Sequence, residues 1–181
     1  VHENKINNML ITYKKATQFM AIFMFTIVGI ICTFSYEIIY AWTNNVQLAH
    51  WGKNILFWYV MGNGVLAISG LQYMLQFAYG SLKIHVQYNT IFALISLPII
   101  AFTAYHYSAI GVAFMWFVFR IISFFIWVPI VHHKFAPGMH RNWILNDICP
   151  ILISSVTYLI IIKWLGFDFN HYRSEEHTSE L

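Results

Sequence analysis

Residues 49–83 read AHWGKNILFWYVMGNGVLAISGLQYMLQFAYGSLK, and this stretch decides the fold class of the chain. From Ile55 to Tyr79 it contains no charged residue. A helix needs roughly 20 apolar residues to cross a bilayer, and this run is longer. The stretch therefore predicts a transmembrane helix.

Small and polar residues interrupt this predicted helix. At about 100° per residue, several of them share one narrow stripe, which consists of Gly62, Ser69, Gln72, Gln76, Gly80 and Lys83. Amides are costly against lipid, so we expect the stripe to face protein or water. Two interpretations stay open: close helix packing through small residues, or the lining of a transport cavity. Asn63 lies off the stripe unless the glycines beside it bend the helix.

The composition extends the membrane prediction to the whole chain. Of the 181 residues, 59% are hydrophobic and 9% are charged, whereas soluble domains carry about 25% charged residues. The mean hydropathy is +0.61. We therefore expect an all-α, multi-pass transmembrane helix bundle. The few Lys and Arg residues lie between apolar runs rather than in one patch, so no nucleic-acid partner is expected.

The apolar runs predict about five spans, which cover roughly residues 16–40, 50–79, 84–104, 108–131 and 145–166. Because the chain begins at Val1 rather than Met, residues 1–172 are expected to be the C-terminal transmembrane lobe of a longer protein. Residues 173–181, RSEEHTSEL, resemble translated adapter sequence and are interpreted as a non-native tail.

Basic residues predict the orientation of these spans. One side holds Lys5, Lys14, Lys15, Lys83, Lys134 and Arg141, and the other holds Lys53 and Lys163. The positive-inside rule makes the first side cytoplasmic, with the N-terminus. The 132–144 segment is expected to be a basic cytoplasmic loop near the headgroups, with Pro137-Gly138 as helix breaker and Trp143 as interfacial anchor.

Arg120 is the most informative single residue. It lies about 18 Å along its span from Ser108, at about 1.5 Å per residue, which is near the bilayer midplane. A charge there costs at least ~2.5 kcal/mol. Arg120 shares a helical face with Trp116 and Ser123, and a guanidinium suits a phosphate through paired hydrogen bonds. The alternatives are pairing with backbone carbonyls or snorkelling toward the cytoplasm.

Catalytic and metal signatures are not evident. The nine histidines include one adjacent pair, His132-His133, which is far fewer than membrane di-iron boxes need, so no metal is expected. The chain lacks a nucleophile elbow and a phosphate-binding loop. We therefore expect no catalytic residues, no cofactor and no enzyme. Glu37, near the end of the first span, is interpreted as an interfacial carboxylate.

The order of short motifs resembles the C-terminal part of O-antigen and exopolysaccharide flippases, the polysaccharide branch of the MOP superfamily. The resemblance covers roughly residues 10–165. It rests on Ala41-Trp42 with Asn44-Asn45, Gly62-Asn63-Gly64, the run Leu71–Gly80, Asn89, Leu97-Pro98, Ile110–Ala113 with Trp116, and the segment from His132-His133-Lys134 through Trp143 to Asp147-Ile148.

The resemblance implies the second lobe of a MOP- or MATE-like transporter, two helical lobes around a central cavity. Such proteins flip undecaprenyl-pyrophosphate-linked oligosaccharide repeat units across the bacterial cytoplasmic membrane during surface polysaccharide and lipopolysaccharide biosynthesis. The implied partners are that lipid-linked substrate, the bilayer and the N-terminal lobe of the same protein. The residues expected to line the substrate cavity are Arg120, Gln72, Gln76, Asn63, Trp116 and Asn89. The expected bending points are Gly62, Gly64, Gly70 and Pro98.

Three alternatives remain at this level. A multidrug or lipid II exporter of the same superfamily would differ in substrate. A membrane glycosyltransferase or polysaccharide polymerase would need long outer loops, which the predicted spans do not leave. A structural membrane subunit would use Arg120 only to pair helices.

Overall fold

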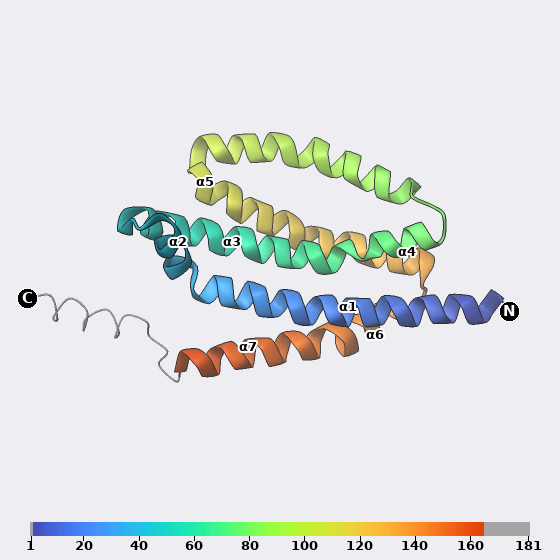
Figure 1. The fold of residues 1–181 in the computed structure, drawn as a ribbon. Helices are drawn as coiled ribbons and strands as arrows, with labels where there is room; N and C mark the ends of the chain where they lie inside the picture. Colours follow the sequence, from blue (N-terminus) through green and yellow to red (C-terminus); the bar gives the residue numbers. More distant parts are fainter. Residues whose placement is uncertain (1, 165–181) are drawn as a thin grey trace, which may run out of the picture.

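The computed structural model describes residues 2–164, and every regular element in that range is helical (Figure 1). The predicted tail 173–181 and the last residues of the predicted fifth span lie outside this range. The elements are α1 (His2–Thr33), α2 (Ser35–Thr43), α3 (Val46–Gly70), α4 (Gln72–Ala78), α5 (Lys83–Phe135), α6 (Met139–Asn142), the π-helix η1 (Trp143–Ile148) and α7 (Cys149–Trp164).

Four stretches of the described residues are long and apolar enough to cross a membrane: Ile6–Thr33, Val46–Ala78, Lys83–Phe135 and Met139–Ile162. The 53 residues of α5 are two helices joined at a kink, because Ser108 has φ 57° and ψ −162°. Figure 1 shows the chain folding back on itself there. The third stretch thus consists of two antiparallel arms, residues 83–107 and 109–135, where the sequence predicts its third and fourth spans.

The first predicted span differs from the structure. The sequence predicts one span over residues 16–40, but α1 begins at His2 and ends at Thr33. Phe34 interrupts the helix with φ −109° and ψ 27°, and the short α2 follows. α1 contacts η1, and Tyr13 in the first half of α1 stacks on Trp143, a contact that apolar periodicity does not reveal.

α3 lies at the centre of the bundle, in contact with α1, α2 and α5. Glycines make these contacts close: a Cβ atom on Gly62 would lie 2.7 Å from Cδ1 of Trp116, and one on Gly64 would lie 2.8 Å from Cγ2 of Val28. The helix runs unbroken through both glycines. Close packing, the first interpretation of the stripe, therefore describes Gly62. α3 ends at Gly70, and Leu71 separates it from α4.

The segment expected to be a basic loop is mostly helical. The chain turns only around Pro137-Gly138, where Gly138 has φ 80°, so the predicted breaker is confirmed. Trp143 is completely buried, so the prediction that it anchors the protein at the membrane interface is wrong. Tyr13, Phe124 and His140 stack around its indole, and the chain enters the core at this point.

The π-helix η1 leads from this turn into α7. The Cys149 N–H donates to the carbonyl of Ile144, five residues earlier. Pro150 follows, and proline has no N–H and crowds the carbonyl four residues before it. A wider turn relieves that crowding, which explains why the π-helix occurs here.

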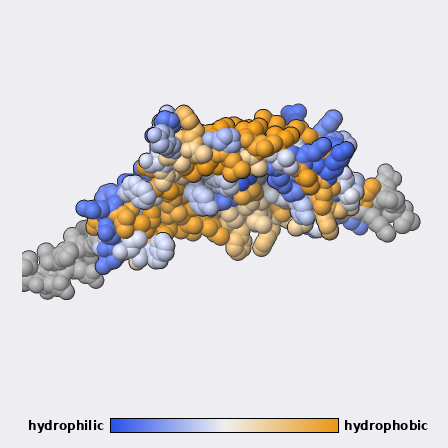
Figure 2. Space-filling model, turned by 90° about the horizontal axis from the view of Figure 1, so that it is seen from above, coloured by the Kyte–Doolittle hydropathy of each residue, from blue (hydrophilic) through white to orange (hydrophobic). Residues whose placement is uncertain are grey.

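The surface separates into apolar and polar zones. Apolar residues dominate the middle of the face in Figure 2, and hydrophilic residues gather toward the ends. Trp42, Tyr105 and Trp164 are 85–88% exposed. They lie on α2, beside the α5 kink and at the end of α7, which meet at one end of the bundle (Figure 1). Such an aromatic girdle is typical of a membrane interface.

Candidate functional site

Arg120 lies between the two arms of α5. Its guanidinium carbon is 3.9 Å from the ring centre of Trp116, one turn earlier on the same arm, and 4.8 Å from the ring centre of Phe92 on the other arm. Cation–π contacts of this kind contribute about 0.5–2 kcal/mol each. The side chain is half-buried, and its Nε atom has no hydrogen-bond partner among the described residues.

The rest of the predicted Arg120 face closes the α5 hairpin. Tyr88 of the first arm stacks on Trp127 of the second, with ring centres 4.3 Å apart, and its hydroxyl contacts that of Ser123. The same tyrosine lies beside the Arg120 guanidinium. The immediate surroundings of Arg120 are therefore aromatic rings; Trp116 was expected from the shared helical face, whereas Phe92 and Tyr88 of the other arm were not.

Gln72 and Gln76 of α4 are buried, and Gln76 is 0% exposed. The Oε1 of Gln72 and both amide atoms of Gln76 lack a hydrogen-bond partner among the described residues. A buried polar atom without a partner costs about 1–3 kcal/mol. These amides thus remain available to a water molecule or to a polar group from outside this chain.

Among the described residues, no hydrogen bond joins these two amides to the other residues predicted to line the cavity. The Asn63 amide donates to the carbonyl of Tyr59, at 2.8 Å, and the residue is half-buried. The Asn89 amide is 2.9 Å from Nε2 of His85. Trp116 is the predicted residue that contacts Arg120, and its Nε1 atom is also buried without a partner. Pro98 lies inside a helix that continues through it.

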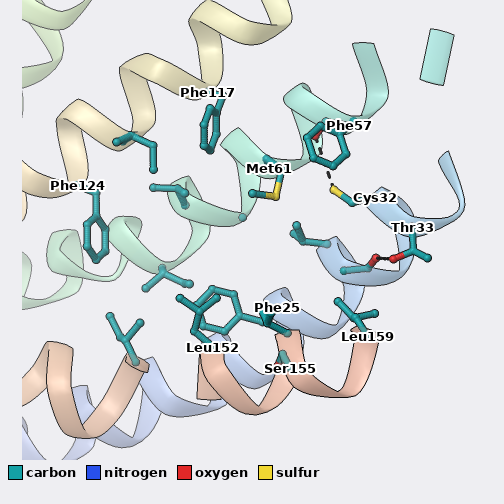
Figure 3. Close-up of a pocket in the computed structure, with 18 of the residues that line it drawn as sticks. Phe25, Cys32, Thr33, Phe57, Met61, Phe117, Phe124, Leu152, Ser155 and Leu159 are labelled. Atoms are coloured by element: carbon teal, nitrogen blue, oxygen red, sulfur yellow. Dashed lines mark hydrogen bonds between the residues drawn. The ribbon is translucent and has the colours of Figure 1, made fainter. Parts of the chain in front are cut away.

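A separate cavity of about 960 Å³ opens between α1, α3, the second arm of α5 and the η1–α7 segment (Figure 3). This volume is at the upper end of the roughly 300–1,000 Å³ typical of ligand pockets. Of the residues predicted to line the substrate cavity or to act as bending points, only Gly64 lines this cavity. The walls are mainly apolar, and the side chains in Figure 3 include Phe25, Met61, Phe117, Phe124, Leu152 and Leu159.

A buried polar cluster escaped the sequence reasoning. His132 is 0% exposed; its Nε2 is 2.8 Å from the Tyr13 hydroxyl, and its Nδ1 is 2.9 Å from Nδ1 of His140. The Trp143 indole donates to the Thr17 hydroxyl at 3.1 Å. The available signal was the Pro137-Gly138 breaker, since a turn between two histidines can bring their rings together.

Asp147 was also missed. It is buried in η1, and its Oδ1 accepts a 2.7 Å hydrogen bond from Nε2 of Gln18 on α1. Its Oδ2 has no partner in the described range. The signal was a carboxylate inside the predicted fifth span, where a charge needs a partner. Among the described residues, no group of three or more His, Cys, Asp or Glu side chains is placed to hold a metal ion.

These features define the class: an α-helical membrane protein with several apolar helices and with polar groups buried in the bundle. Comparison with models of protein families, with curated protein sequences and with solved structures finds no match to the chain.

Proposed function

We propose that the chain is the C-terminal lobe of a flippase that moves undecaprenyl-pyrophosphate-linked oligosaccharide repeat units across the bacterial cytoplasmic membrane. The resemblance of its motifs to polysaccharide flippases supports this proposal. The observation that carries it is the environment of Arg120, a half-buried cation within an apolar helical hairpin.

The geometry of Arg120 suits an anionic ligand. Trp116 and Phe92 lie within cation–π distance of the guanidinium, and such contacts use its flat faces, so its N–H edges remain available to acceptors. Two buried donors without a partner in the described residues lie on adjacent side chains: Nε of Arg120 and Nε1 of Trp116. Phosphate oxygens are strong acceptors, and a diphosphate group offers enough of them to satisfy both donors.

Basic residues supply the orientation for this proposal. Lys83 begins α5 and Lys134 lies in its last turn, at the end of the bundle that also holds the N-terminus of α1 (Figure 1). The positive-inside rule makes this end cytoplasmic. The girdle of Trp42, Tyr105 and Trp164 then lies at the outer interface.

The test is an Arg120→Ala substitution at the native locus, with surface polysaccharide and membrane protein level measured together. Exposed Arg141 offers a matched control, Arg141→Ala. We expect Arg120→Ala to abolish the polysaccharide at normal protein level, and Arg120→Lys to recover it only in part because an ammonium cannot donate a bidentate pair. Full polysaccharide in Arg120→Ala would overturn the proposal. Loss accompanied by depletion of the protein would instead assign Arg120 to hairpin packing.

A further inference from the structure

The 960 Å³ cavity has a chemistry different from that of Arg120. We infer that it binds one hydrocarbon chain of an amine-bearing membrane lipid, with the lipid's ammonium group beside Glu37. This inference does not depend on the proposed transport function, because the cavity and Arg120 are separate features: Arg120 does not line the cavity.

The walls and dimensions of the cavity match a lipid chain. Its lining on α1 runs from Phe25 to Thr33, which is about 12 Å at 1.5 Å per residue, and continues onto α2 at Glu37. One leaflet contributes about half of the roughly 30 Å hydrocarbon core, so this length accommodates one chain from one leaflet. Phe25, Met61, Phe124 and Leu159 project toward the same space from four different helices, α1, α3, α5 and α7, and provide apolar contacts along it (Figure 3).

The polar end of the cavity lies at headgroup depth. Thr33 and Glu37 line it where α1 gives way to α2. Trp42, five residues beyond Glu37, is 88% exposed and belongs to the aromatic girdle. Because such aromatic residues mark the level of the headgroups, a chain in the cavity places its headgroup near Glu37.

Charge selects the headgroup. Among the lining residues that the structure describes, Glu37 is the single charged side chain and none is Lys or Arg. Glu37 is half-buried, and no ion pair involving it is present in the described range. An ammonium group, as in phosphatidylethanolamine, complements this carboxylate, whereas a headgroup with only negative charge is repelled.

The test uses the full chain reconstituted in vesicles of phosphatidylethanolamine and phosphatidylglycerol in equal amounts. Either lipid carries a photoactivatable diazirine near the middle of one chain, and mass spectrometry locates the crosslinks. We expect crosslinks on the cavity-lining residues of α1 and α7. We also expect a preference of about fivefold for the ethanolamine lipid, the scale of a partly exposed ion pair.

Two neighbouring serines provide a matched pair of variants. Ser155 lines the cavity (Figure 3), whereas Ser154 is exposed and donates to the carbonyl of Ile151. Ser155→Phe fills the cavity and is expected to reduce cavity crosslinks to background, while Ser154→Phe leaves them unchanged. Glu37→Gln is expected to remove the headgroup preference without removing the crosslinks.

If Ser155→Phe fails to fold, the crosslink map of the unmodified chain still tests whether a lipid chain occupies the cavity. Crosslinks confined to outward-facing residues, or cavity crosslinks that Ser155→Phe leaves intact, would overturn the inference. If no crosslinks map to the residues that line the cavity, another part of the polypeptide or a second copy fills the space. Equal labelling by the two lipids would refute the role of Glu37.

Discussion

Gly62→Ala should loosen the centre of the bundle, although it adds a single methyl group. The new Cβ would lie 2.7 Å from Cδ1 of Trp116 and 3.2 Å from the backbone Cα of Phe117, well inside the roughly 3.5–4.0 Å optimum for carbon atoms. Trp116 can rotate, but the backbone of Phe117 can move only if α3 and α5 separate. Overpacking of this kind costs about 1–3 kcal/mol, and the better helix propensity of alanine returns about 0.5–1 kcal/mol.

The net loss of up to about 2.5 kcal/mol corresponds to a decrease in Tm of up to about 10 °C for a chain of this size. Gly70→Ala is the control, because a Cβ atom there meets nothing within 4 Å; its Tm should stay constant or rise. Thermal unfolding of the purified protein in detergent, followed by circular dichroism, measures both. Equal Tm values for the two variants would refute close packing at Gly62 and favour the bending role predicted from the sequence.

Three further substitutions test the buried cluster and the α5 kink. Trp143→Ala should lower the free energy of unfolding by about 3–5 kcal/mol, since the ring is fully buried. Trp42→Ala, at an exposed position, should change it by less than about 0.5 kcal/mol. Denaturant titration compares the two variants. Gln18→Leu removes the partner of Asp147 and should destabilise the protein by about 1–3 kcal/mol in the same titration, and an unchanged midpoint would argue against that bond. Ser108→Gly should raise Tm, because φ 57° with ψ −162° strains a residue that has a side chain by about 1–3 kcal/mol; a lower Tm would mean that the kink is not strained.

The predicted substrate residues show where sequence reasoning stops. Arg120 and Trp116 share a helical face, so their contact follows from spacing alone. Phe92 and Tyr88 enter the same cluster only because the chain folds back at Ser108, and no local pattern specifies which residues then meet across the hairpin. The burial of His132 likewise depends on a contact with Tyr13, which lies 119 residues away in the sequence.

The sequence by itself determined that this chain is helical and membrane-embedded, because runs of apolar residues of bilayer length allow few other structures. It also located the kink between the third and fourth predicted spans and the break at Pro137-Gly138. Only the tertiary structure decided which residues face inward, and with them the packing of Gly62, the burial of Trp143 and the position of the cavity. The physical reason is that lipid and protein are equally apolar surroundings for leucine or phenylalanine, so a membrane helix lacks the polar face that identifies the buried side of a soluble helix.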